Sequence, residues 1–124
     1  MRDTFIEELT KRASIDPNVF LITGDLGFGV LEEFGESFPD QFLNAGVAEQ
    51  NMTAIAAGMA MEGRKVFTYS IGNFPTLRCL EQIRNDICLH DVPVCIVSVG
   101  GGFGYGALGS SHHNLEDVAC LGSL

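Results

Sequence analysis

The chain is short of basic residues: seven Lys and Arg stand against sixteen Asp and Glu, which gives a formal net charge of −9 over 124 residues. Nucleic acids and anionic membranes attract proteins through clustered Lys and Arg. The basic residues here are scattered along the sequence. We therefore expect neither nucleic acid nor a membrane surface as a partner.

Long apolar runs and closely spaced cysteines are missing as well. No stretch approaches the roughly 18 apolar residues of a membrane span, and no basic start leads into an apolar signal segment. The four cysteines are Cys79, Cys88, Cys95 and Cys120. They lack CxxC spacing, and three of the four fall in apolar segments. We expect reduced, structural thiols in a soluble, cytoplasmic protein.

Short apolar runs alternate with segments of helical periodicity over a length suited to one domain. The expected helices cover 3–14, 48–63 and 77–87, and the expected strands cover 18–25, 41–46, 65–70 and 92–100. Asp3 or Thr4 is the expected cap of the first helix. Strand 18–25 should be buried on both faces. Alternation over short connections indicates an α/β fold with a mostly parallel sheet sandwiched by helices.

The C-terminal end lacks a closing strand. Only a short helix is expected within the final segment "GSSHHNLEDVACLGSL". We therefore expect a single domain, residues 1–124, that is cut short at this end or completed by another chain.

Ligands of open parallel sheets bind at the carboxyl ends of the strands. Four segments are expected at that edge: Asp25, 45–49, 70–74 and 100–113. The last contains a GxGxxG pattern, formed by Gly104, Gly106 and Gly109. A dinucleotide site also needs a helix that starts at this loop and an acidic residue about 20 positions later. Two serines and two histidines follow Gly109 before a helix can start, and only fifteen residues remain after that glycine. A dinucleotide-binding domain is therefore only an alternative.

Asp25 and Asn51, 26 positions apart, weakly resemble the metal and diphosphate motif of thiamine enzymes. In that motif, Asp and Asn oxygens bind Mg²⁺. Asn51 falls inside an expected helix, however, and Leu26 stands where the motif has Gly. We expect no metal site in this chain.

A charged residue, Glu49, interrupts the otherwise apolar "NAGVAEQNMTAIAAGMAMEG". The segment "FLNAGVAEQNMTAIAAGMAMEGRKVF" resembles the pyrimidine-binding domain of the transketolase family of thiamine diphosphate enzymes. "LRCLEQIRNDI" and "GSSHHNLEDVA" are similar to later blocks of that family in the same order, so the resemblance spans about Val19 to Ala119. It implies the thiamine diphosphate-binding fold of that domain and a thiamine diphosphate cofactor. The cofactor's Mg²⁺ or Ca²⁺ would be held by a diphosphate-binding partner subunit, in a homo- or hetero-oligomer.

The resemblance also implies roles for individual residues. Glu49 would hydrogen-bond the pyrimidine ring nitrogen and act as a proton relay while the cofactor loses a proton from its thiazolium carbon, and His112 would contact substrate oxygens. Phe74, flanked by Ile71 and Leu77, would pack on the pyrimidine face, and Asp25 would lie close to the cofactor. Simpler roles remain open: a solvated carboxylate at a helix start for Glu49, core packing for Ile71 and Leu77, an incidental loop position for His112, and turn formation for Asp25.

The departures from the family pattern concern the substrate. Leu108 stands where the family has a sugar-binding Asp, Gly100 replaces a His, and Gly29 aligns with a phosphate-contacting Ser. The resemblance thus implies transfer of a ketol or related carbonyl-derived unit, active only with the partner chain, from a sugar-like donor other than an ordinary ketose phosphate. A degenerate relative that serves as an interaction or regulatory module is the alternative.

Overall fold

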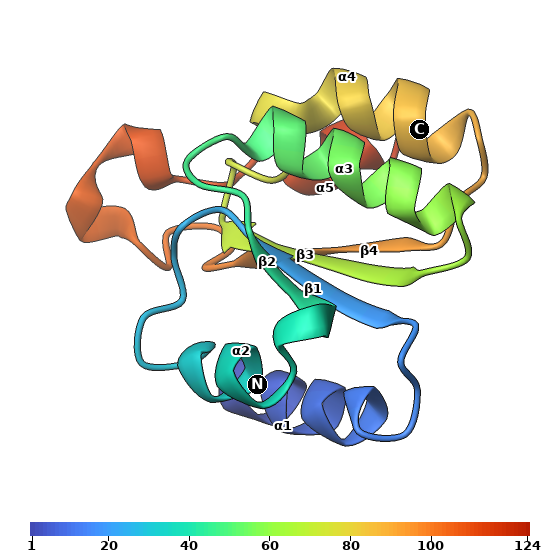
Figure 1. Ribbon diagram of the computed structural model, residues 1–124. Coiled ribbons are helices and arrows are strands. Elements are labelled where there is room, and N and C mark those ends of the chain that lie inside the picture. Colours follow the sequence, from blue (N-terminus) through green and yellow to red (C-terminus); the bar gives the residue numbers. More distant parts are fainter.

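Four parallel strands form the centre of the structure, and helices cover both faces of the sheet (Figure 1). The computed structural model describes residues 1–124. The sheet has the order β2-β1-β3-β4 and consists of β1 (Val19–Thr23), β2 (Phe42–Asn44), β3 (Lys65–Ile71) and β4 (Val94–Val99). Every neighbouring pair runs parallel. The expected α/β fold with a parallel sheet is confirmed.

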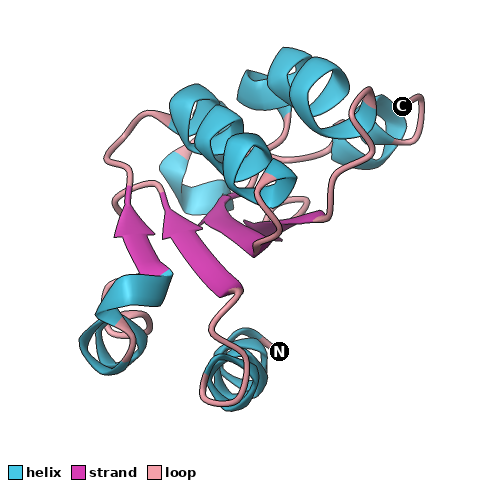
Figure 2. Ribbon diagram, turned by 45° about the vertical axis from the view of Figure 1, so that its right-hand side comes forward, coloured by secondary structure: helices cyan, strands magenta, loops and turns pink.

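The helices form one layer on each side of the sheet (Figure 2). One layer contains α1 (Arg2–Ala13) and α2 (Glu32–Ser37), and the other contains α3 (Glu49–Met61), α4 (Leu80–Gln82) and α5 (Asp117–Leu121). Short 3₁₀ turns lie at Pro39–Gln41, Leu77–Cys79, Gly106–Leu108 and Ser110–His112, and a π-helical turn lies at Ile83–Cys88. No helix is long and apolar enough to cross a bilayer.

Strand β1 is the centre of the core, because all five of its residues are buried. Leu21 belongs to the cluster under α1 and α2, together with Phe34. Ile22 points the other way and packs with Met52 and Ala56 of α3. Alternating side chains of one strand thus join the two layers, and the expected burial on both faces is confirmed.

Two helical predictions need correction. The first helix begins at Arg2 with Met1 at the N-cap and no side-chain cap, so neither Asp3 nor Thr4 caps it. Asp3 lies inside the first turn and accepts a hydrogen bond from Arg2 Nε at 3.0 Å. Segment 77–87 is helical but changes between 3₁₀, α and π geometry, which leaves Ile83 and Ile87 buried.

Helix α2 was not expected, since its sequence EEFGES is too short and polar to show a helical period, and only Phe34 is buried. Strand β4 forms an edge of the sheet, since it pairs with β3 alone. All four cysteines are free, but only Cys79 is buried, whereas Cys88 and Cys95 are exposed. The expectation of packed, structural thiols therefore holds for Cys79 alone.

Phe34 should contribute strongly to stability, because its side chain is 1% exposed and its ring lies 5.2 Å from that of Phe38 and 6.3 Å from that of Phe42. We expect Phe34→Ala to lower the free energy of unfolding by about 3–5 kcal/mol. The matched control is Phe28→Ala, at a position that is 81% exposed, with an expected change within about 0.5 kcal/mol. Urea denaturation of both variants measures the difference, and equal losses would contradict this core assignment.

Candidate functional site

Glu49 begins helix α3 and is buried, with a relative exposure of 2%. The carboxylate lies near the helix N-terminus, where the dipole favours a negative charge. Gly24, just after β1, lies against it: a Cβ there would be 3.4 Å from Glu49 Cγ and 3.5 Å from Ser70 Oγ of β3. The carboxyl ends of two neighbouring strands therefore meet the start of α3 at this side chain.

Arg78 neutralises the buried carboxylate. Its Nη1 donates a hydrogen bond to Glu49 Oε2 at 2.6 Å, and no other hydrogen bond to that carboxylate is present. The guanidinium also lies 4.6 Å from the centroid of the Phe74 ring, in a cation–π contact. A buried charge is costly unless it is paired, so Arg78 explains how Glu49 is accommodated.

Phe74 links this pair to His112. The two rings lie 5.2 Å apart at an interplanar angle of 71°, in an edge-to-face arrangement. His112 ends the 3₁₀ turn Ser110–His112, and its Nδ1 lies 3.0 Å from Ser111 Oγ. The structure therefore brings together Glu49, Phe74 and His112, which the sequence had placed in three separate blocks.

Asn114 fixes the loop that carries His112. Its side chain is 1% exposed, and Nδ2 donates to Ser98 Oγ at 3.2 Å and to Asp117 Oδ2 at 2.8 Å. Its backbone forms an antiparallel bridge with Gly102. A Cβ on Gly72 would approach Asn114 Cβ to 3.3 Å, so the loop packs closely on the turn after β3.

A hollow of about 360 Å³ opens beside the buried carboxylate. It is lined by Val47, Ala48, Glu49, Gln50, Asn51 and Arg78. Asn51 lies within α3, as expected from the sequence. Ser70 Oγ is buried without a hydrogen-bond partner. The hollow thus has a carboxylate and a guanidinium in its wall, and the unpaired Ser70 hydroxyl lies near the carboxylate on the side of Gly24.

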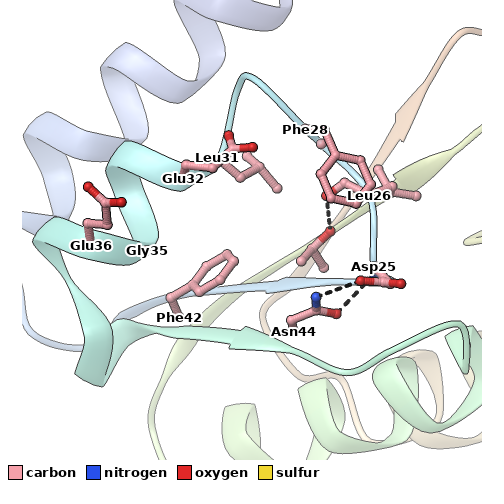
Figure 3. Close-up of a pocket in the computed structure, with 11 residues that line it drawn as sticks. Asp25, Leu26, Phe28, Leu31, Glu32, Gly35, Glu36, Phe42 and Asn44 are labelled. Atoms are coloured by element: carbon pink, nitrogen blue, oxygen red, sulfur yellow. Dashed lines mark hydrogen bonds between the residues drawn. The ribbon is translucent and has the colours of Figure 1, made fainter.

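Asp25 lines a different hollow, of about 350 Å³, between the end of β1 and helix α2 (Figure 3). Its φ of 58° is left-handed. The Asn44 side chain hydrogen-bonds both the carboxylate and the backbone N–H of Asp25. Asn44 Nδ2 donates to Asp25 Oδ1 at 2.9 Å, and Asn44 Oδ1 accepts from the Asp25 N–H at 3.1 Å. Asp25 therefore forms part of a turn, and it does not line the hollow beside Glu49.

Ile71 and Leu77 also lie outside the Glu49 hollow. Ile71 lines a third hollow, together with Tyr69 and Val99. Leu77 begins the 3₁₀ turn that leads to Arg78. The glycine-rich loop contains two short 3₁₀ turns, at Gly106–Leu108 and Ser110–His112. The helix that a dinucleotide site requires at that loop is not formed.

Comparison with known proteins identifies the family. The family model for the pyrimidine binding domain of transketolase matches residues 1–124. The chain belongs to the transketolase pyrimidine-binding domain family. A split-gene transketolase, solved as an inactive beta4 tetramer, matches with a TM-score of 0.79 and 30% identity, over 96% of this chain and 38% of that one. The expected family and fold are thus confirmed.

Curated relatives agree with this assignment. One of the subunits of the apulose-4-phosphate transketolase of Phocaeicola vulgatus is 39% identical over 97% of this chain and 39% of its own length. A 1-deoxy-D-xylulose-5-phosphate synthase of Clostridium perfringens is 38% identical over 95% of this chain and 19% of its own length. The chain therefore spans two fifths or less of the relatives that it matches.

Sequence reasoning missed Arg78 and Asn114, and it expected Ser70 only as the first residue of the edge segment 70–74. Arg78 follows Phe74 by four positions, the spacing of neighbours on a helical turn, and this was an available signal. Ser70 lies near the end of the apolar strand β3. The alternation of side chains along a strand determines which face of the sheet its hydroxyl is on. Asn114 carried no comparable signal, because its partners come from β4 and α5.

Cys79 provides a chemical test of how tightly this region is packed. Its Sγ donates to the Phe74 carbonyl at 3.3 Å, and burial raises the pKa of the thiol. Alkylating reagents attack the thiolate. We expect iodoacetamide to modify Cys79 at least about ten times more slowly than the exposed Cys88, as measured by mass spectrometry of timed samples. Comparable rates would show that the Phe74 turn opens readily.

Proposed function

We propose that this chain is the pyrimidine-activating part of a transketolase-like, thiamine diphosphate-dependent transferase. The enzyme transfers a ketol or related carbonyl-derived unit and is active only with a diphosphate-binding partner chain. Thiamine diphosphate supplies a carbanion-type nucleophile for attack on a carbonyl group. The residues of this chain would bind and orient its pyrimidine ring.

The observation that carries the proposal is the buried Glu49 carboxylate at the wall of a hollow. An aminopyrimidine is flat and presents a ring nitrogen at its edge, which suits a carboxylate set among small residues such as Ala48. The unpaired Ser70 hydroxyl adds a second polar group near the carboxylate. The residues present fit the aminopyrimidine, and Glu49 would hold a proton at its ring nitrogen.

His112 and Phe74 would complete the site. The edge-to-face contact fixes both rings relative to one another, and such aromatic pairs contribute about 0.5–1.5 kcal/mol beyond area burial. Phe74 would pack against the pyrimidine, and His112 would face the substrate's oxygens. Asp25 would contribute from the neighbouring turn, and Ile71 and Leu77 would support the packing around Phe74.

The need for a partner is supported by the names of the relatives. One is a single subunit of a transketolase, and the solved structure is a split-gene transketolase whose beta4 tetramer is described as inactive. A diphosphate-binding chain would hold Mg²⁺ or Ca²⁺ and the diphosphate, in a hetero-oligomer with this one. We expect this chain alone to bind thiamine diphosphate weakly and to show no turnover.

A catalytically inactive interaction module is the second candidate. The Arg78–Glu49 ion pair favours it, because a paired carboxylate has a structural role even without a cofactor. Calorimetric titration of thiamine diphosphate and Mg²⁺ into the mixed chains separates the two candidates, since a module would give no binding heat.

Replacement of the carboxylate tests the proposal directly. Glu49→Gln keeps the shape of the side chain but removes the group that would hold the proton. We expect the activity of the mixed chains to fall by at least about 100-fold, the lower range for general acid–base catalysis. The matched control is Glu62→Gln, at the exposed C-cap of α3, which should retain full activity in the same assay. Equal activity of the two variants would refute the role of Glu49.

The missing sugar contacts generate a prediction about the donor. Leu108 is 58% exposed in the turn that should carry the family's sugar-binding carboxylate. We expect the reconstituted enzyme to transfer a two-carbon unit from xylulose 5-phosphate poorly. Leu108→Asp should increase that transfer by about tenfold, as one charged hydrogen bond allows. A coupled assay of the aldehyde product measures this transfer. Robust transfer by the reconstituted enzyme with the unaltered chain would count against the donor hypothesis.

A further inference from the structure

We propose that Arg78 is a positioning residue that holds one oxygen of Glu49 and leaves the other free for the pyrimidine ring. This inference rests on the proposed function and adds a residue to it. Arg78 Nη1 binds Oε2 at 2.6 Å, and Oε1 accepts no hydrogen bond from the protein. Oε2 therefore has a partner within this chain, whereas Oε1 has none.

The hollow beside the pair supports this division. Both Glu49 and Arg78 line it, and its volume is about 360 Å³ with the arginine in its present position. This volume is sufficient for a planar ring beside the guanidinium. Glu49 is 2% exposed, whereas the Arg78 side chain is 43% exposed, so the arginine reaches in from the surface to the buried acid.

Phe74 restrains the arginine. The guanidinium carbon lies 4.6 Å from the ring centroid, and a planar guanidinium on an aromatic face keeps its hydrogen-bonding fork in a defined orientation. Phe74 is itself fixed by the edge contact with His112 and by the bond from Cys79 to its carbonyl. A chain of contacts thus orients the carboxylate.

Ser70 shows why such an orientation is needed. Its hydroxyl is buried and unpaired. Ser70 Oγ and Glu49 Oε1 lie 3.5 Å and 3.7 Å from the same point, the position of a Cβ on Gly24. Without Arg78, the carboxylate is free to rotate and take the Ser70 hydroxyl as its donor. The free oxygen would then be lost to an incoming ring.

The first test uses this chain alone and no cofactor. Arg78→Gln leaves Glu49 buried without its partner, which is the costly way to break an ion pair. Because Arg78 is 43% exposed, solvent replaces part of the pairing, and we expect the melting temperature to fall by about 4–8 °C. In the Glu49→Gln background the same substitution should have a smaller effect, because the charge is already gone. Equal effects in the two backgrounds would overturn the pairing.

The second test measures binding of 4-amino-2-methylpyrimidine to this chain by saturation-transfer NMR. We expect Arg78→Gln to weaken binding by about three- to tenfold, since a charged hydrogen-bond acceptor is then misplaced. Arg78→Lys should give an intermediate affinity, because the charge is kept and the planar fork is lost. The matched control is Arg84→Gln, since the exposed Arg84 side chain hydrogen-bonds Asn85 and lies outside the Glu49 hollow, and this variant should bind like the unaltered chain.

The outcomes separate this inference from the proposed function. Unchanged binding by Arg78→Gln would overturn the positioning role and leave the proposed function intact. Tighter binding would also overturn it, because the arginine would then occupy the place of the ring. If neither the unaltered chain nor Glu49→Gln binds the pyrimidine, the proposed function fails, and the melting experiment still decides whether Arg78 holds Glu49.

Discussion

The burial of one carboxylate is the constraint on which the rest of this structure depends. Glu49 is 2% exposed at the first residue of α3, where the helix dipole favours its charge and Arg78 pairs with it. Removal of a charge from water is expensive unless such partners are present. The Glu49 carboxylate is therefore kept in the interior by Arg78 and lies beside small residues such as Ala48 and Gly24.

The parallel sheet makes this arrangement possible. All four strands end at the same edge, so the turn after β1, the turn after β3 and the start of α3 meet there. The loop after β4 returns to the same edge and is fixed by Asn114. Phe74 and His112 come into contact for this reason, although a long stretch of sequence separates them.

Most of the fold follows from local sequence signals. The β-branched apolar run predicts that β1 is a strand buried on both faces. Helix α3 is predicted by the helical spacing of its apolar residues Met52, Ile55, Ala56 and Met59. Helix α2 escapes such reasoning because it is short and buries one side chain, and the π turn at Ile83–Cys88 depends on packing against α3. Local propensity decides neither.

The candidate site was only partly predictable. The apolar setting of Glu49 was visible in the sequence, but its partner Arg78 lies 29 positions away, and no local rule joins them. Ile71 follows Ser70 in one strand, so the two side chains point to opposite faces. Because Ser70 points toward Glu49, Ile71 points to the other face of the sheet. Matching a sequence motif does not take this alternation into account. Asp25 was expected near the cofactor, and Asn44 holds it in a turn beside another hollow.

The most direct measurement is a crystal structure of this chain with its diphosphate-binding partner and thiamine diphosphate. The account predicts a Glu49 carboxylate oxygen within about 2.6–3.2 Å of the pyrimidine ring nitrogen. A cofactor ring bound away from α3, with Glu49 still facing only Arg78 and solvent, would contradict it.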